Sequence, residues 1–423
     1  MRTGKRFVHG LVIGLSMFIC LAGALATPSD SQAAYSILYS FAGGTGDGFQ
    51  PFGSLTLAGS TLYGLTYGGP HPPSPQPSYS GTIFEINLDG SGYQILHPFG
   101  GPDAKDGTIP KGSLTLSGET LYGFTPYGGG PNNSNVGGSV FKINTNGTGY
   151  QNLHGWSGNP PPDAHRHPIG TPVVSGSTIY GMTTDEQAGE GNGSIFKINT
   201  DVTGYQLLYA FGGAPSDGAL PQGSLTLVGS KLYGMTSKGG SFGSTVGGYG
   251  VIFSLNLDTS EYLVLHNFAG APNDGINPAG ALTLVGSKLY GMTAAGGKNN
   301  TSGVLFSINL DDGVYQVLFD FSTVNVSGPH GSLTHSGSKL YGMTAYGGGG
   351  GAVFQINTDG TGFRLLHHFN SFAGDGTYPY GDVTVVGSRL YGMTNGGGSS
   401  GDGVIFSCQI PQDTGMLLLL LLQ

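Results

Sequence analysis

Charge is scarce in this chain of 423 residues. Lysine and arginine together number 15, aspartate and glutamate number 24, and charged residues make up only 9%, far below the roughly 25% of ordinary soluble domains. The formal net charge is -9, and no basic residues cluster along the chain. Nucleic-acid binding needs a basic surface that neutralises phosphates, so we expect no nucleic-acid partner.

Cysteine is almost absent, with only Cys20 and Cys408. Cys20 lies in an apolar run over residues 11–25, which follows a basic start and ends in a small-residue pattern at residues 24–26. These features predict a signal peptide over residues 1–26, with cleavage after residue 26 or nearer residue 34. Removal of Cys20 would leave Cys408 alone, and no disulfide could then form within the mature chain.

Long hydrophobic runs are missing after the N-terminal segment. The C-terminus carries six leucines before Gln423, whereas a helix that spans a bilayer needs about 20 apolar residues. A proline precedes this run, as in bacterial sorting tails of the Pro-Glu-Pro type, but Gln412 and Asp413 replace the motif's Glu and Pro. We interpret residues 409–423 as a degenerate or truncated sorting or anchor segment, and a frameshifted reading frame explains these residues equally well.

Signatures of catalysis and of helices are missing too. The sequence has no Gly-x-Ser-x-Gly elbow in a hydrolase context, no phosphate-binding loop and no zinc-ligand spacing. Helical periodicity is absent from the mature part. We therefore identify no catalytic residue and no cofactor, and leave a divalent cation open.

Glycine, by contrast, is abundant at 81 residues, and it recurs at a regular period. Leu-Tyr-Gly or Ile-Tyr-Gly, followed one residue later by Thr, occurs seven times. The repeated tyrosines are Tyr63, Tyr122, Tyr180, Tyr233, Tyr290, Tyr341 and Tyr391. They are spaced 50 to 59 residues apart, a period typical of propeller blades of four short strands.

Each repeat predicts four antiparallel strands. In the fourth copy, residues 223–229 and 231–236 form a tight hairpin, and residues 250–256 and 262–268 form the third and fourth strands. Asp-Gly or Asn-Gly stands between the third and fourth strands in four other copies, which predicts two-residue hairpins there.

The phase of the repeat predicts a closed ring. The mature chain begins with a fourth strand, residues 35–41, and ends with a third strand, residues 403–408. Pairing these two strands would remove an exposed sheet edge. The predicted fold is all-β, a seven-bladed β-propeller over residues 35–408 with four-stranded antiparallel blades, closed by the N-terminal strand pairing into blade seven.

Aromatic residues also recur once per repeat, which predicts packing between blades. The third-strand row is Phe84, Phe141, Phe196, Phe253, Phe306, Phe354 and Phe406. A fourth-strand position alternates among His, Tyr and Phe, so we interpret its histidines as interblade packing residues and not as metal ligands. The glycine after each repeated tyrosine predicts close approach of another side chain, for example an aromatic ring of the next blade.

The links between blades and the loops between second and third strands should share one face, because both begin where an even-numbered strand ends. The candidate ligand-binding residues are the aspartates of the interblade links: Asp47, Asp106, Asp163, Asp217, Asp274 and Asp375. A ring of carboxylates could attract a divalent cation or a polyhydroxylated ligand. Alternatively, each aspartate caps its own turn, which is the interpretation we favour.

Copy three departs from the other links. It carries His165 and His167 beside Asp163, and two histidines near a carboxylate could coordinate a metal, although the sequence names no third ligand. The loops between second and third strands vary most, and variable loops on a fixed scaffold usually carry binding specificity.

The repeated unit P-x-G-S-L-T-L, L-Y-G-x-T-x-x-G-G and G-x-[VI]-F-x-[IL]-N resembles the GloVer tandem repeat of bacterial choice-of-anchor proteins. The resemblance covers about residues 35–408. It implies a kelch-like propeller, export and a C-terminal surface anchor of variable type, but no established biochemical activity.

We therefore predict an exported or cell-surface monomer that acts as a binding or structural module. Its partner would be an unknown protein or polysaccharide at the cell surface, and it would contact a membrane only through a C-terminal anchor. The alternative is an extracellular carbohydrate-active enzyme or a metal-binding protein that uses the aspartate-rich face. Such an enzyme would need two carboxylates within about 10 Å of each other around a groove.

Overall fold

The computed structural model describes Met1 and residues 34–411, apart from residues 45, 72–73, 79, 101–104, 131–136, 157–165, 185–190, 244–246 and 371–373. The predicted signal peptide beyond Met1, the tail from residue 412, Asp163 and His165 lie outside the described residues. Within the described part, no helix is long and apolar enough to cross a membrane.

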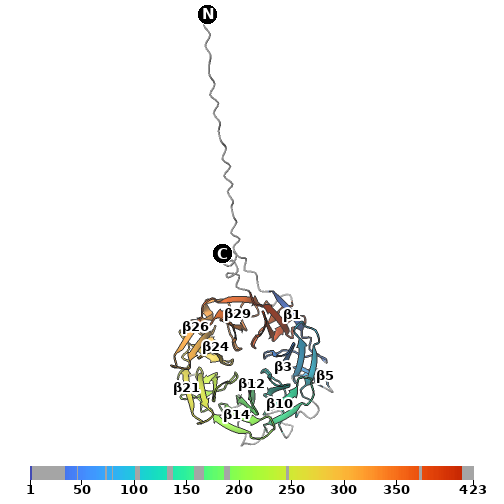
Figure 1. Cartoon of the computed structure of the whole chain (residues 1–423). Helices are drawn as coiled ribbons and strands as arrows, with labels where there is room; N and C mark the ends of the chain where they lie inside the picture. Colours follow the sequence, from blue (N-terminus) through green and yellow to red (C-terminus); the bar gives the residue numbers. More distant parts are fainter. Residues whose placement is uncertain are drawn as a thin grey trace. The chain divides into compact units, whose positions relative to one another are not determined.

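Seven antiparallel sheets follow one another around a ring (Figure 1). Blades one and two consist of β2 (Thr56–Ala58), β3 (Thr61–Thr66), β6 (Thr82–Asn87) and β7 (Gln94–Pro98), then β8 (Thr115–Ser117), β9 (Thr120–Thr125), β10 (Ser139–Asn144) and β11 (Gln151–Gly155). Blades three and four consist of β12 (Pro168–Ser175), β13 (Thr178–Thr183), β14 (Ser194–Asn199) and β15 (Gln206–Ala210), then β17 (Thr226–Val228), β18 (Lys231–Thr236), β20 (Val251–Asn256) and β21 (Tyr262–Asn267).

Blades five and six consist of β23 (Thr283–Val285), β24 (Lys288–Gly296), β25 (Val304–Asn309) and β26 (Tyr315–Asp320), then β27 (Thr334–Ser336), β28 (Lys339–Thr344), β29 (Ala352–Asn357) and β30 (Arg364–His368). Short strands in the loops add small pairs: β4 (Gly69–His71) with β5 (Ser74–Ser78), β16 (Gly218–Ala219) with β19 (Lys238–Gly239), β22 (Gly275–Pro278) with β24, and β31 (Gly376–Thr377) with β34 (Gly396–Gly397). A 3-10 turn, η2 (Phe321–Thr323), follows β26.

Blade seven joins the two ends of the ring. It consists of β32 (Thr384–Val386), β33 (Arg389–Thr394), β35 (Val404–Gln409) and the N-terminal strand β1 (Tyr35–Ser40). β1 runs antiparallel to β35, with Tyr35 opposite Cys408 and Ser40 opposite Val404. The all-β propeller and its closure by the N-terminal strand are therefore confirmed.

The connection between third and fourth strands is longer than predicted. In blade one, β6 ends at Asn87 and β7 begins at Gln94. Asp89 accepts hydrogen bonds from the backbone N–H and hydroxyl of Ser91, at 2.9 and 2.6 Å. Positive φ values occur at Gly90, of 86°, and at Gly92, of 69°, but not at Asp89. The two-residue hairpin prediction is wrong because side-chain capping, and not the Asp-Gly dipeptide alone, sets the turn.

The hydrophobic core lies between neighbouring blades. All seven third-strand phenylalanines are fully buried, and each of seven apolar clusters joins two adjacent blades. The cluster that closes the ring joins Tyr391 and Met393 of blade seven to Leu62 and Phe84 of blade one. Burial of each such phenylalanine contributes about 1.5–3 kcal/mol, so the ring is held together by its interblade contacts.

The glycine after each repeated tyrosine is needed for a close approach, as predicted, but the approaching ring belongs to the same blade; at Gly181 alone among the seven, Phe124 of blade two approaches as well. Gly64 on β3 lies opposite Phe84 on β6, and a Cβ at Gly64 would lie 2.4 Å from Cζ of Phe84. The phenylalanine folds over its own cross-strand partner because a glycine leaves that space open.

Candidate functional site

Seven glycines, one from each blade, surround the central channel. A Cβ on Gly53 would lie 2.0 Å from the carbonyl oxygen of Gly112 in the next blade. A Cβ on each later glycine would lie 1.8 to 2.4 Å from the carbonyl oxygen of the next blade's glycine, and Gly381 closes the ring onto Gly53. The ring is Gly53, Gly112, Gly170, Gly223, Gly280, Gly331 and Gly381. A side chain here would collide with rigid backbone, so only glycine fits.

Polar side chains follow six of the seven glycines, all but the one in blade five, and they link blades around the channel. The N–H of Ser54 donates to Oγ of Ser113 at 2.7 Å, and the N–H of Asp382 donates to Oγ of Ser54 at 2.7 Å. Asp382 accepts from the N–H of Ser332 and is the one carboxylate in this ring. Burial raises the pKa of Asp382, against the hydrogen bonds from Ser332 and Ser54 that lower it.

The channel is narrow beside the glycines and wider beyond them. The space lined by the glycine ring has a volume of about 80 Å³, enough for a few water molecules. Further along the first strands, a hollow of about 450 Å³ is lined by Thr56, Thr334, His335 and Thr384 among others. The narrow part faces the interblade links, and we call that side of the ring the loop face.

One residue per blade, between a constant proline and a ring glycine, varies completely. The seven residues are Phe52, Lys111, Ile169, Gln222, Ala279, His330 and Tyr380. All but Ile169 line the mouth of the channel. Sequence reasoning missed this position, although the variable residue inside the constant Pro-x-Gly motif is a signal that could have found it.

Aromatic rings gather on one side of this mouth. We call the group formed by Tyr67, Phe52, Tyr380, His330, Tyr346 and Tyr378 the aromatic arc. Phe52 stacks on Tyr380, with ring centroids 5.1 Å apart and planes inclined by 13°, and Tyr67 lies 5.5 Å from Phe52. The arc therefore crosses from blade one to blade seven.

The other half of the arc consists of His330, which is partly buried, and of Tyr346 and Tyr378, which are exposed. His330 lies edge-on to Tyr380 at 5.3 Å and to Tyr346 at 6.0 Å, and burial lowers the pKa of His330. Tyr346 and Tyr378, with centroids 6.1 Å apart, expose 43% and 42% of their surface. Blades six and seven thus present two tyrosine rings to solvent.

The residue before each link proline has a left-handed backbone, including Tyr378 with φ 57°. The N–H of Tyr378 donates to the carbonyl of Gly350 in blade six at 2.8 Å, and its carbonyl accepts from the N–H of Asn395 in blade seven at 3.1 Å. Such a backbone costs about 1–2 kcal/mol, which these interblade hydrogen bonds offset. His167 occupies the same position in blade three, with φ 62°.

His167 is buried, and its ring lies 5.0 Å from that of Tyr127. Its predicted companions, Asp163 and His165, lie outside the described residues. Within the ranges that are described, no three His, Cys, Asp or Glu side chains are grouped so that they could hold a metal ion. A metal site in copy three stays a prediction.

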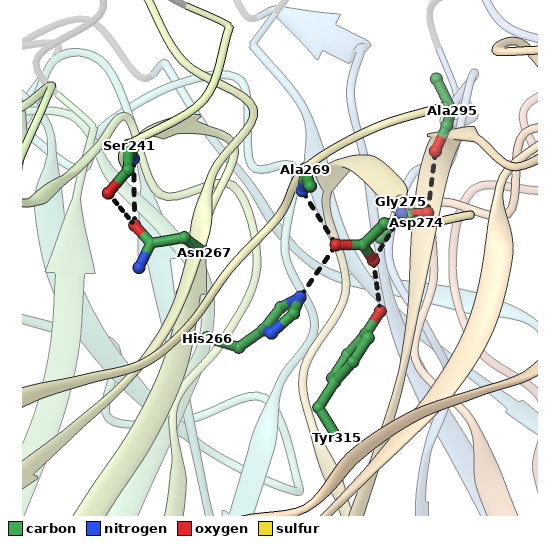
Figure 2. Close-up of polar contacts among 9 residues, drawn as sticks. Ser241, His266, Asn267, Ala269, Asp274, Gly275, Ala295 and Tyr315 are labelled. Atoms are coloured by element: carbon green, nitrogen blue, oxygen red, sulfur yellow. Dashed lines mark hydrogen bonds and ion pairs between the residues drawn. The ribbon is translucent and has the colours of Figure 1, made fainter. Parts of the chain in front are cut away.

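The link aspartates join two blades, as Figure 2 shows for Asp274. One of its carboxylate oxygens accepts from Nε2 of His266 at 2.9 Å and from the N–H of Ala269 at 2.8 Å. The other accepts from the N–H of Gly275 and the hydroxyl of Tyr315, both at 2.7 Å. His266 stacks on Tyr315 at 3.6 Å, and we call this arrangement the interblade clamp.

The described link aspartates share this pattern. Each accepts from a fourth-strand side chain and from the N–H groups of its own turn, in the pairs Tyr39 with Asp47, His97 with Asp106, Tyr209 with Asp217, His266 with Asp274 and His367 with Asp375. Both oxygens of each carboxylate are engaged by the protein. The geometry therefore favours turn capping over a ring of ligand-binding carboxylates.

The fourth-strand histidines pack between blades, as predicted. The stacked pairs, with centroids 3.6 to 4.4 Å apart, are Tyr39–Tyr93, His97–Tyr150, His154–Tyr205, Tyr209–Tyr262, His266–Tyr315, Phe319–Phe363 and His367–Tyr35. In copy six, Asn325 replaces the aspartate and both stacked rings are phenylalanine. Histidine or tyrosine therefore occurs in the stacked pair where the link carries an aspartate, and phenylalanine where it carries Asn325. This correlation was not recognised from the sequence.

These features define a tandem-repeat propeller whose constant residues build the ring and whose variable residues surround one mouth of the channel. The chain belongs to the Gloeobacter/Verrucomicrobia repeat family, whose model matches residues 22–247 and 241–406. The resemblance to GloVer repeats is therefore confirmed. No curated protein is detectably similar to the chain.

Solved structures share the fold. The oligogalacturonate lyase of Vibrio parahaemolyticus is 12% identical, with a TM-score of 0.58 over 91% of this chain and 95% of the lyase. An oligogalacturonate lyase in complex with manganese is 10% identical, with a TM-score of 0.53 over 90% of this chain and 97% of that one. Likeness at such low identity shows the propeller fold alone.

Proposed function

We propose that this protein is an exported or cell-surface binding module that contacts its ligand with the loop face. The supporting observation is the Pro-x-Gly position, where six different residues line one channel mouth between a fixed proline and a fixed glycine. A purely structural ring would gain nothing from such variety at equivalent positions around one channel mouth. Variable side chains on a rigid scaffold are typical of ligand recognition.

Export is supported by the N-terminal sequence pattern and by what the repeat resemblance implies. Purification of the protein from the medium or cell envelope of a bacterial host, followed by N-terminal sequencing, tests this part. We expect a mature form that begins at Thr27 or close to residue 34. A protein that keeps Met1 and stays in the cytoplasm would contradict export.

The carbohydrate-active enzyme and the metal-binding protein remain weaker alternatives. Asp47, Asp217 and Asp274 are buried, and their oxygens already accept hydrogen bonds from side chains and turns. A general acid or a metal ligand at these positions would have to give up those contacts. The arrangement is better suited to holding blades together than to chemistry.

Thermal unfolding of the full chain tests the binding function. The probes are Mg²⁺, Ca²⁺ and Mn²⁺, the neutral polysaccharides laminarin, dextran and galactomannan, and the anionic polygalacturonate. A ligand at 100 times its Kd stabilises a folded protein by about 2.7 kcal/mol, which is a measurable rise in Tm. We expect at least one probe to raise the Tm.

Two variants locate the effect. Tyr380→Ala changes the channel mouth, whereas Val314→Ala changes an exposed residue in a third-to-fourth-strand turn, on the side opposite the loop face. We expect the Tm rise to disappear in Tyr380→Ala and to persist in Val314→Ala. No rise with any probe, or a rise that Tyr380→Ala retains, would contradict a loop-face binding module. A rise with a cation alone, lost in Asp163→Ala/His165→Ala, would favour the metal-binding alternative.

A further inference from the structure

The exposed end of the aromatic arc is held in place before any ligand arrives. The N–H of Tyr346 donates to the carbonyl of Ser327 at 3.0 Å, and its carbonyl accepts from the N–H of Ser327 at 2.9 Å. Tyr378 is fixed by its bonds to Gly350 and Asn395. Both rings therefore stand on ordered backbone, so binding to them would cost little conformational entropy.

The chemistry of the arc suits a neutral, amphipathic ligand. Five of its six members are phenylalanine or tyrosine, and burial lowers the pKa of His330, which favours the uncharged imidazole. Two further ionisable side chains line the same mouth: Lys111, whose Nζ lies 6.0 Å from the ring of Tyr67, and Asp382, whose pKa is raised by burial. A sugar ring presents C–H groups on its face and hydroxyls at its edge, so it can stack on an aromatic face and still hydrogen-bond to tyrosine hydroxyls.

The size of the site indicates a chain that crosses the channel mouth. The rings of the aromatic arc surround the mouth of the channel, outside the glycine ring, so a saccharide that stacks on them would lie over the mouth. The arc extends from Tyr67 in blade one, through blade seven, to Tyr346 in blade six. An extended polymer matches that shape better than a single sugar.

Other partners fit less well. The net charge of -9 opposes binding of an anionic polymer. A stable protein interface buries a broad apolar centre, whereas the other large hydrophobic side chain exposed in the described part of the loop face is Phe242 in blade four.

We propose that the aromatic arc binds a neutral polysaccharide, with sugar rings stacked on Tyr346 and Tyr378 and the polymer lying across the channel mouth towards Phe52. This inference rests on the proposed binding function and names its ligand class and its contact residues.

Native gel electrophoresis of the full chain, in gels that contain laminarin, dextran, galactomannan or polygalacturonate, tests the inference. We expect at least one neutral polymer to retard the wild type. Tyr346→Ala/Tyr378→Ala should weaken that retardation about tenfold or more, because two stacking contacts are lost. Tyr346→Phe/Tyr378→Phe keeps the rings and should retain most of the binding.

Phe242→Ala is the matched control, since it removes an exposed aromatic ring from the loop face outside the arc, and its retardation should equal that of the wild type. Retardation by a neutral polymer that survives in Tyr346→Ala/Tyr378→Ala would overturn the arc as the site and leave the binding function intact. Retardation only by polygalacturonate, abolished by about 0.5 M salt, would overturn the neutral ligand class. Absence of retardation by every polymer would overturn the inference, whereas a Tm rise with any probe that Tyr380→Ala abolishes would still support the loop-face binding function.

Discussion

Loss of the Asp274 carboxylate should destabilise the propeller by about 3 kcal/mol, because hydrogen bonds to a charged group contribute about 1.5–3 kcal/mol each. Asp274 is 7% exposed and accepts four hydrogen bonds of 2.7 to 2.9 Å. In Asp274→Asn, an NH₂ group replaces one oxygen and faces two donors, so two of these bonds are lost. Relief of a buried charge and rotation of the Tyr315 hydroxyl offset part of the loss.

The assay is denaturant unfolding of the full chain at pH 7, followed through the midpoint at constant m-value. The matched control is Asp258→Asn, which makes the same chemical change at an exposed residue in a turn of blade four. The control should stay within about 0.5 kcal/mol of the wild type. A similarly small effect of Asp274→Asn would refute the clamp.

Copy six supplies a second test, because it carries Phe319, Phe363 and Asn325 where copy five's clamp has His266, Tyr315 and Asp274. The variant His266→Phe/Asp274→Asn/Tyr315→Phe copies that arrangement. It should recover about 1–2 kcal/mol relative to Asp274→Asn, because the side-chain donors left without an acceptor are gone. A triple variant whose loss equals the sum of the three single losses would show that the residues act independently.

Two further predictions concern acid stability and the central ring. Burial alone would raise the pKa of Asp274, but its four hydrogen bonds lower it overall. A carboxyl whose pKa is lower in the folded than in the unfolded state stabilises the fold at pH values above its unfolded pKa. That contribution is lost as the pH falls through the folded pKa. The wild-type Tm should therefore fall below about pH 4 more steeply than that of Asp274→Asn, and parallel curves would contradict this. Gly223→Ala places a Cβ 2.1 Å from the carbonyl oxygen of Gly280 and should cost more than about 2 kcal/mol or prevent folding. Gly46→Ala is the control, because nothing lies within 4 Å of the added Cβ, and it should unfold like the wild type. Equal soluble yields and equal Tm values for the two variants would contradict the requirement for glycine in the central ring.

The fold could be predicted because its determinants repeat in the sequence. The tyrosine period defined the blades, and the offset between residues 35–41 and 403–408 predicted how the ring closes. The turn after the third strand was predicted wrongly because its geometry depends on side-chain capping, here by Asp89 on Ser91, which dipeptide preferences do not encode.

The candidate site was harder to predict because its residues do not repeat. Tyr346 and Tyr378 come from two different loop sets, and only the closed ring brings them together. The interblade clamps were also missed. From the sequence, the fourth-strand histidines, such as His266, and the link aspartates, such as Asp274, were treated as unrelated residues, although a short turn brings them into hydrogen-bond contact. Local pattern predicts the scaffold, whereas contacts between blades depend on the finished ring.

The pairing of β1 with β35 also determines when the propeller can be completed during synthesis. Tyr35 is among the earliest ring residues to leave the ribosome, and its partner Cys408 is among the latest. At 5–20 residues per second, β1 waits about 20–75 s as an unpaired edge strand. Such an edge invites pairing with other chains, so the nascent propeller depends on protection of its first strand until the last one arrives.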